Sequence, residues 1–416
     1  MLENLRKNVK GTFNNQNIDF IFNNCFLNTI DTTLSVDSDG FFVITGDIPA
    51  MWLRDSSMQV YPYLYFIKDK EVKELIKGVL QKQFQLIIID PYANAFMKNE
   101  KCKSEWEGKI QTDYLPKIVW ERKFELDSLC FPLFLCSKYF EFTDDLSIFN
   151  ETFFEAFDKI IETVEKERHH SKRSSYYFIR PPKENVGKHT NPNEEKGLVW
   201  SGFRPSDDAC KYNYHIPDNM FLVTVLNKFK RIFSILKDEK RTEICIKLEK
   251  ELAALINEYG ITEVPNFGKL YVSETDCLGN IVLDDDANFP SLLSIPFLEY
   301  PYIDKEIYAN TRRYILSENN KYYYQGKLLN GIGSPHTPPN RVWPLSLSMQ
   351  GITSNNEEEI INCFKQLVIS SNNQNLMHES VDVNNVSIYS RPWFAWANSQ
   401  FALFALKHKD LINKKM

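Results

Sequence analysis

The segment SGFRPSDDACKYNYHIPDNMF, residues 201–221, gathers residue types that suit acid–base chemistry on a sugar. Asp207 and Asp208 are adjacent carboxylates after an Arg-Pro-Ser turn, and Asp218 lies in a Pro-Asp-Asn turn before an apolar run. Aromatic rings stack on the apolar faces of a pyranose, while carboxyl groups hydrogen-bond its hydroxyls or exchange protons with its linkage oxygen. The segment therefore indicates a carbohydrate pocket capable of proton transfer.

Hydrolysis of a glycosidic bond needs a protonated carboxyl group at the leaving oxygen and an ionised one that activates water or attacks the anomeric carbon. Asp207 or Asp208 can supply the first, because adjacent acids oppose each other's ionisation and burial raises a pKa further. Glu379, in the polar stretch MHESV beside His378, can supply the second. A separation of roughly 6.5–9.5 Å would indicate an inverting enzyme, and about 5 Å a retaining one.

Two further segments carry side chains that suit a polyhydroxylated ligand. Trp52, Arg54 and Asp55 lie in TGDIPAMWLRDSS and offer a stacking face, a fixed multi-donor cation and an acceptor. The alternative is a buried Arg–Asp pair beside a core tryptophan. His336, in GIGSPHTPPNRVW, is expected to contact a hydroxyl or serve as a structural donor, because no second histidine lies at metal-ligand spacing.

The sequence offers no support for metal or nucleotide chemistry. It contains no HExxH motif, EF-hand loop or His/Cys cluster, and no GxGxxG or GKS/T motif. The triple aspartate at residues 284–286 could bind calcium, but it is equally typical of a solvated turn and helix cap. We therefore expect neither a metal nor a cofactor.

Composition restricts the other function classes. The chain has 416 residues, 43% of them hydrophobic, and a net charge of −6, which disfavours a nucleic-acid surface. Its eight cysteines are scattered and are expected to be free thiols in a reducing compartment. Because no segment approaches the roughly 18 apolar residues of a membrane span, we expect a cytoplasmic protein. We also expect one domain over residues 1–416, as a monomer or weak homo-oligomer.

Helical periodicity dominates the chain. Apolar residues recur at three- and four-residue intervals in four stretches, Lys70–Ile89, Phe149–Arg168, Arg231–Tyr259 and Asn356–Ser370. Strand-like alternation is sparse and is clearest at Gly40–Thr45 and Gly268–Glu274. These patterns predict an all-α protein with minor strand content in its loops.

A looser recurrence predicts the architecture. Polar residues lead directly into apolar, aromatic-rich segments at six places, namely Arg54-Asp55, Asp127, Asp218-Asn219, Asp286, Arg341 and Arg391. Segments that are apolar on nearly every face belong inside a structure, and the amphipathic stretches between them belong outside. Six inner helices alternating with six outer ones describe a closed (α/α)6 barrel, with a pocket formed by the loops at one rim. The stretch Arg180–Lys196 is expected to be a surface loop near the pocket mouth.

Acids at these helix starts have a structural alternative. Aspartate at the start of a helix accepts hydrogen bonds from unpaired backbone N–H groups. For Asp127 and Asp218, such capping and substrate contact remain open alternatives. For Asp218, capping is a complete explanation, so it is the least certain of the candidate acids.

Six motifs taken together resemble glycoside hydrolase family 125. They are GDIPAMWLRDS, SGFRPSDDA, IPDNMF, SPHTPP, HES and SRPWFAWANSQF, and they extend from Gly46 to Phe401. The resemblance implies a metal-independent, inverting, exo-acting α-1,6-mannosidase on an (α/α)6 barrel, which removes terminal non-reducing mannose from mannans or N-glycans. It places the acid in SGFRPSDDA, with Asp207 preferred to Asp208, and the base at Glu379. The residues that it implies hold the sugar are Trp52, Arg54, Asp55, Arg204, His336, Arg391 and Trp393.

Two rival functions remain at this stage. An α-glucosidase of the glucoamylase type would use the same pair of acids with different hydroxyl contacts. A non-catalytic glycan-binding protein would keep the aromatic and arginine contacts, but it would not need opposed carboxylates. A mannose-containing oligosaccharide is the expected partner, with no nucleic acid and no membrane.

Overall fold

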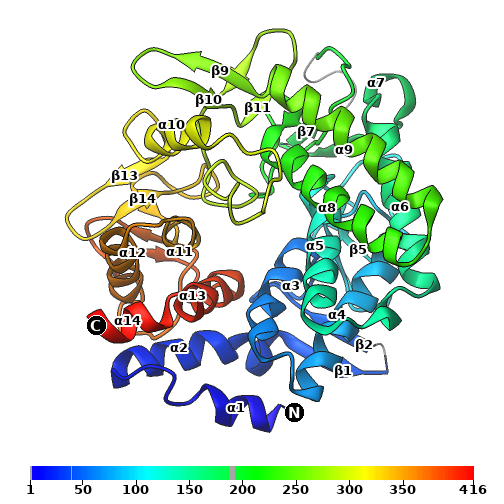
Figure 1. The fold of residues 1–416 in the computed structure, drawn as a ribbon. Helices are drawn as coiled ribbons and strands as arrows, with labels where there is room; N and C mark the ends of the chain where they lie inside the picture. The colour runs from blue at the N-terminus through cyan, green and yellow to red at the C-terminus, as the bar shows by residue number, and fades with distance from the viewer. Residues whose placement is uncertain (1, 39, 183, 187–192) are drawn as a thin grey trace.

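The computed structural model describes residues 2–38, 40–182, 184–186 and 193–416 (Figure 1). Its described residues form fourteen α-helices, and no strand among them is longer than four residues. The prediction of a mainly helical protein with minor strand content is therefore confirmed. None of the described helices combines the length and apolar character needed to cross a membrane, and none of the eight cysteines forms a disulfide bond.

Five apolar helices line the centre of the molecule. They are α3 (Leu53–Val60), α5 (Leu126–Thr143), α8 (Ile216–Ile235), α11 (Pro344–Ile352) and α13 (Ala395–Lys407). Helix α3 packs between α5 and α13, α8 packs on the far side of α5, and α11 packs on the far side of α13. Each begins where the sequence predicted an inner helix, because a polar or turn residue there gives way to a run that is apolar on most faces.

Amphipathic helices cover these five from outside. They include α2 (Gln16–Asn28), α4 (Lys70–Ile89), α6 (Glu151–Glu167), α9 (Glu239–Tyr259), α10 (Lys305–Ile315) and α12 (Glu357–Ser370). Helix α9 packs along α8, α12 along α11 and α2 along α13. In Figure 1 the first and last helices, α1 (Glu3–Val9) and α14 (Lys409–Lys415), lie on the same side of the molecule. The ends of the chain are joined there by the Asn14 N–H, which donates to Asn413 Oδ1 at 2.8 Å.

Two helical predictions need correction. The periodic stretch 231–259 is divided between α8 and α9, because Asp238 caps a new helix by accepting a hydrogen bond from the Arg241 N–H. The fourth predicted inner helix, after Asp286, does not form. Its residues 287–298 run through bends and turns, because Pro290 and Pro296 lack the N–H groups that a helix there would require.

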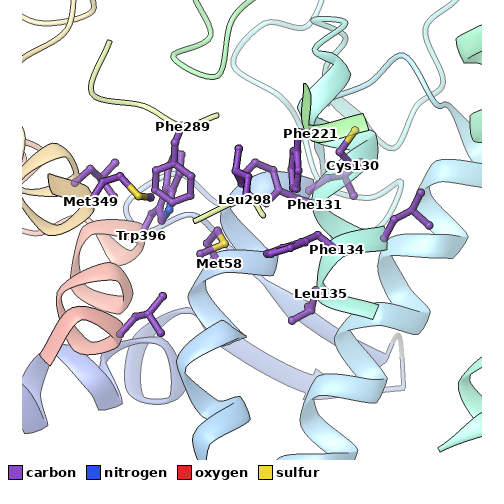
Figure 2. Close-up of a cluster of buried hydrophobic side chains, with 14 of the residues drawn as sticks. Met58, Cys130, Phe131, Phe134, Leu135, Phe221, Phe289, Leu298, Met349 and Trp396 are labelled. Atoms are coloured by element: carbon purple, nitrogen blue, oxygen red, sulfur yellow. The ribbon is translucent and has the colours of Figure 1, made fainter. Parts of the chain in front are cut away.

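The non-helical segment still fills the core at that position. Phe289 is fully buried, and its ring centroid lies 4.8 Å from that of Trp396 and 6.1 Å from that of Phe131. Figure 2 shows this ring among side chains from α3, α5, α8, α11 and α13. Leu298, at the end of the segment, is also buried in this cluster. The segment thus takes the packing role that was predicted for a helix.

Helix caps separate the inner helices from the outer ones. The N-caps of the six outer helices named above each accept a backbone hydrogen bond through a side chain, and they are Asn15, Asp69, Asn150, Asp238, Asp304 and Asn356. The five inner helices begin at N-caps that provide no such bond in the described structure, and these are Trp52, Glu125, His215, Trp343 and Phe394. The capping explanation of Asp127 and Asp218 is therefore wrong. Asp127 lies inside the first turn of α5, which begins after Glu125. Asp218 lies inside the first turn of α8, which begins after His215.

Short antiparallel sheets lead into three of the inner helices. Strand β3 (Met51–Trp52) pairs with β4 (Ala95–Phe96), which also pairs with β5 (Val119–Glu121). Strand β8 (Tyr214–His215) pairs with β11 (Glu274–Thr275), and β15 (Arg341–Val342) pairs with β16 (Ser380–Asp382), which pairs with β17 (Tyr389–Ser390). The chain passes straight from β3, β8 and β15 into α3, α8 and α11. These sheets therefore fix the loops at the end of the molecule where the inner helices begin.

The predicted strands are confirmed with small changes. Gly40–Thr45 contains β2 (Gly40–Val43), which pairs with β1 (Leu34–Asp37). Gly268–Glu274 divides into β10 (Gly268–Tyr271), which pairs with β9 (Ile261–Val264), and the start of β11.

Candidate active site

One cavity at the start of the inner helices brings together carboxylates from distant parts of the chain. Asp207 and Glu379 both lie in its wall. Its full lining is Thr45, Ile48, Trp52, Arg54, Asp55, Pro205, Ser206, Asp207, Asn288, His336, Trp343, Glu379, Arg391, Phe394 and Trp396. Seven of the ten predicted site residues therefore line the same cavity.

Arg54, in the first turn of α3, organises the floor of this cavity. Its Nη2 lies 2.8 Å from Asp207 Oδ1, and its Nη1 lies 2.8 Å from Glu125 Oε2 and 3.1 Å from Asp127 Oδ2. Its Nε is also 3.4 Å from Asp55 Oδ1. The guanidinium is nearly inaccessible to solvent, with 3% of the side chain exposed, so four carboxyl groups surround one buried cation. Its fork of donors fixes their relative positions.

Asp207 is held by backbone contacts as well as by this arginine. Its φ of 63° is in the left-handed region, which aspartate tolerates better than most residues. Its N–H donates to the Arg204 carbonyl at 2.9 Å, and its own carbonyl accepts from Lys123 Nζ at 2.7 Å. A strained backbone held on both sides is typical of a functional position, and here it presents the carboxylate to the cavity.

The electrostatics of Asp207 and Asp208 differ from the prediction. Burial alone would raise the pKa of Asp207, but the charges of Arg54 and Lys123 outweigh it and lower the pKa below its usual value. The pKa of Asp208 is also lowered, because His336 and Arg204 outweigh burial. The expectation that these neighbours raise each other's pKa is wrong, since each carboxylate faces its own cation.

The raised carboxyl pKa values belong to residues below the cavity. Burial raises the pKa of Glu125 well above its usual range, and the negative charge of Asp207 adds to the effect. Burial likewise raises the pKa of Asp127 to about 7, against the opposing charge of Arg54. The two carboxyl groups behind Asp207 therefore hold a proton more readily than Asp207 does.

Asp208 acts on the cavity through a histidine. Its Oδ1 lies 3.6 Å from His336 Nδ1, and its Oδ2 accepts from Ser206 Oγ at 2.9 Å. Burial would lower the pKa of His336, but the hydrogen bond and charge of Asp208, followed by the charges of Asp207 and Glu379, raise it to about 9. His336 is thus an imidazolium at neutral pH and offers a charged donor at the cavity wall.

Glu379 comes from a part of the chain distant from Asp207 and lies immediately before β16. Its N–H donates to the Ser390 carbonyl, and its Oε1 lies 3.5 Å from Arg391 Nε. Arg391 also lies 3.7 Å from Asp47 Oδ1, and its φ of 51° is in the left-handed region. His378 stabilises this turn, because its Nδ1 lies 3.0 Å from the Arg391 carbonyl. The loop therefore orients a carboxylate and an arginine together.

Aromatic and polar side chains complete the lining. Thr45 Oγ1 donates to Asp55 Oδ2, which turns that carboxylate toward the N-terminal loop. The Arg54 guanidinium lies 5.5 Å from the ring centroid of Trp396, and Trp52 contributes a second indole to the cavity wall. An apolar ring surface beside fixed charged donors and acceptors suits a pyranose.

Three predicted residues lie outside the cavity lining. Arg204 faces Glu274, with its Nε 3.7 Å from Glu274 Oε1. The half-buried Trp393 covers Gly46 instead, its ring 3.5 Å from the position that a Cβ there would occupy. Asp208 reaches the cavity only through His336, as described above. Arg204 and Trp393 therefore support the walls in this structure.

The third acid of the opening segment is fully buried. Asp218 Oδ1 lies 3.0 Å from His215 Nδ1, and it is not part of the cavity lining. Burial raises the pKa of Asp218 well above its usual value and lowers that of His215 to about 4, so the contact joins two uncharged groups.

The predicted mouth loop, Arg180–Lys196, is only partly within the described residues, because 183 and 187–192 lie outside them. Its described part includes β7 (Glu184–Val186), which pairs with β6 (Phe178–Arg180). Glu184 lies 2.8 Å from Lys123 Nζ. This hairpin therefore contacts the lysine that holds the Asp207 backbone.

Sequence reasoning missed several residues of the site. Glu125 and Lys123 lie in the stretch ERKFELDS, where nothing in their spacing distinguishes them from solvated charges. Trp396 was within a recognised motif, and Trp343 and Asn288 each lie two residues after a polar residue, Arg341 or Asp286, that marks a predicted helix start. The rule that rim residues precede an apolar segment could have identified these last two.

The described residues contain no group of three or more histidine, cysteine, aspartate or glutamate side chains arranged to hold a metal ion. The aspartates at 284–286 are engaged otherwise. Asp285 accepts hydrogen bonds from the N–H groups of Leu292 and Leu293, and Asp286 accepts from Ser334 Oγ at 3.2 Å. They organise the turns around Phe289.

Comparison with known proteins places this geometry in a family. A family model described as metal-independent alpha-mannosidase (GH125) matches residues 15–406. A Schizosaccharomyces pombe protein, the meiotically up-regulated gene 157 protein, is 38% identical over 440 residues that cover 100% of this chain and 86% of its own length.

Solved structures agree with the family model. A Streptococcus pneumoniae protein from a family of metal-independent alpha mannosidases, in a non-productive complex with α-1,6-mannobiose, aligns with a TM-score of 0.93 and 37% identity over 98% of both chains. A bacterial glucoamylase bound to acarbose aligns with a TM-score of 0.60 over 95% of this chain and 57% of its own, at 12% identity, which shows a shared fold alone. The chain belongs to glycoside hydrolase family 125, the metal-independent α-mannosidases.

Proposed function

We propose that this enzyme is an exo-acting α-1,6-mannosidase that inverts the anomeric configuration of the mannose it releases. The observation that carries this proposal is the placement of Asp207 and Glu379 in the wall of one cavity, which aromatic rings and two arginines also line. The 37% identical S. pneumoniae relative with α-1,6-mannobiose bound supports the choice of linkage. The substrates would be mannans or N-glycans that end in α-1,6-linked mannose.

Asp207 would be the general acid and Glu379 the general base. Asp207 protonates the linkage oxygen while Glu379 accepts a proton from a water, which attacks the anomeric carbon from the other face. Trp52, Asp55 and Arg391 would hold the sugar, and His336 would donate to a hydroxyl. Asp208 would keep His336 charged. Asp207 is preferred as the acid because it lines the cavity, whereas Asp208 faces His336.

The proposed scaffold is an (α/α)6 barrel in which the segment 287–298 takes the place of one inner helix. It would be a single catalytic domain that acts as a monomer or weak homo-oligomer in the cytoplasm. The absence of disulfide bonds among the eight cysteines is consistent with a reducing compartment.

A linkage panel tests the function. The enzyme is incubated with α-1,2-, α-1,3- and α-1,6-mannobiose and with maltose, each with and without EDTA, and released monosaccharide is measured by chromatography. We expect mannose from the α-1,6 isomer at the same rate with and without chelator. Glucose release from maltose with no mannose from any mannobiose would reject the proposal in favour of a glucosidase.

A further inference from the structure

The position of Glu125 raises a question that the two-carboxylate mechanism leaves open. A general acid must carry a proton when the substrate arrives, yet Arg54 and Lys123 favour the ionised form of Asp207. Glu125 is the N-cap residue of α5, and its side chain is completely inaccessible to solvent. It therefore lies on the protein side of Asp207, where a bound sugar cannot displace it.

One guanidinium joins the two carboxyl groups. Arg54 donates to Glu125 Oε2 through Nη1 and to Asp207 Oδ1 through Nη2, each at 2.8 Å. The Glu125 carboxyl group is also within hydrogen-bond reach of Asp207. A proton shared between two such carboxyl groups removes the repulsion that two carboxylates would have.

The surroundings favour Glu125 as the site of that proton in the empty enzyme. The other groups that face Glu125 are Asn94 Nδ2, at 3.2 Å from Oε1, Ser128 Oγ, at 3.2 Å from Oε2, and the charge of Asp127. Arg54 is shared among four acids, so its single charge does not neutralise them all. Burial and the neighbouring negative charges raise the pKa of Glu125 well above its usual range.

We propose that Glu125 is a positioning residue that stores the proton used by Asp207 and passes it to that carboxylate when a glycan occupies the cavity. The O–H bond of Glu125 breaks as an O–H bond forms on Asp207. Asp207 then gives the proton to the linkage oxygen as the bond between that oxygen and the anomeric carbon breaks, while Glu379 takes a proton from the attacking water. After product release, Glu379 returns its proton to solvent and Glu125 regains one, so atoms and charges balance over the cycle.

The inference rests on the proposed function, and substrates with different leaving groups separate the two. Hydrolysis of α-1,6-mannobiose expels a sugar alkoxide and needs acid assistance. Hydrolysis of 2,4-dinitrophenyl α-mannoside expels a stable phenolate and does not. Glu125→Gln keeps the size of the side chain and retains a donor toward Asp207, but the amide has no proton to transfer.

We expect Glu125→Gln to lower kcat on α-1,6-mannobiose by about 100-fold, within the range typical of acid catalysis. Its kcat on the dinitrophenyl substrate should stay within about threefold of the parent enzyme, which would also demonstrate that the variant is folded. The mannobiose activity that remains should increase toward acidic pH, where Asp207 takes its proton from solvent. The matched control is Asp127→Asn, which also removes a carboxylate from Arg54, and it should affect both substrates equally.

Equal losses on both substrates in Glu125→Gln, or no loss on mannobiose, would overturn the inference. In either case hydrolysis of mannobiose by the parent enzyme would leave the proposed function intact. If the parent enzyme released no mannose from mannobiose, the proposed function itself would fail.

Discussion

Arg54 Nη2 contacts Asp207 Oδ1 at 2.8 Å while His336 Nδ1 lies 3.6 Å from Asp208 Oδ1, so each of the two neighbouring aspartates has its own cation. This division assigns them different tasks, since only Asp207 lies in the cavity wall.

The first prediction compares isosteric variants of these aspartates. Asp207→Asn should reduce kcat on α-1,6-mannobiose by at least about 1,000-fold, because it removes the proposed proton donor. Asp208→Asn should reduce it by about 10-fold, since His336 loses its partner but the donor remains. Steady-state kinetics on both variants, with thermal unfolding as the control for folding, checks the order. A larger loss in Asp208→Asn would exchange the two roles.

The second prediction concerns Glu379. Glu379→Gln should lose activity on both α-1,6-mannobiose and 2,4-dinitrophenyl α-mannoside by about 1,000-fold, because activation of water does not depend on the leaving group. Affinity for mannobiose, measured by calorimetry, should change by less than about 10-fold. If the variant kept full activity on the dinitrophenyl substrate, Glu379 would not be the base.

The third prediction follows from the titration of His336. Its pKa is raised to about 9, so its ion pair with Asp208 adds stability that is fully present below the unfolded pKa of about 6.5. That contribution is lost as the pH rises through about 9. Since 39% of the side chain is exposed, the effect is reduced by solvent screening.

Urea denaturation of the parent enzyme and His336→Gln checks this. The parent should be the more stable of the two at pH 6, and the difference should decrease between pH 7 and 10. A difference that grew over that interval would mean that His336 is uncharged in the folded protein.

The fourth prediction tests the segment that replaces the fourth inner helix. Phe289→Ala should lower the free energy of unfolding by about 3–5 kcal/mol, because it opens a cavity between Phe131 and Trp396. Phe267→Ala is a suitable control, since that ring lies outside the central cluster and contacts only Tyr314 among the described rings, in an edge-to-face arrangement. It should cost less than half as much in chemical denaturation. Equal losses of unfolding free energy in the two variants would show that the segment 287–298 does not stabilise the core more than a ring outside the central cluster does.

Much of the fold could be predicted from the sequence because local patterns dictate it. Helix α4 has the predicted bounds, since Asp69 caps its start and its apolar residues keep one face. The stretch 231–259 was predicted as one periodic unit because only the three residues 236–238 separate α8 from α9. The prediction of a fourth inner helix was wrong because prolines prevent helix formation in an apolar segment. The segment nevertheless remains buried in the core.

The site was predicted unevenly for a different reason. Motif residues such as Asp207, Glu379 and Arg54 could be found because unusual residue types cluster along the chain. The pKa values of Asp207 and Asp208 could not, since they depend on cations contributed by α3, the β5–α5 loop and the loop before β15. Glu125 was missed because its importance arises only from three-dimensional contact with Arg54 and Asp207.

Time-resolved proton NMR of α-1,6-mannobiose hydrolysis, in the presence of EDTA, tests the central claim most directly. A water activated by Glu379 on the face opposite Asp207 must deliver β-mannose as the first product, followed by slow mutarotation. The account predicts an initial anomeric signal from β-mannose with no delay caused by the chelator. An initial signal from α-mannose, or no release of mannose at all, would contradict it.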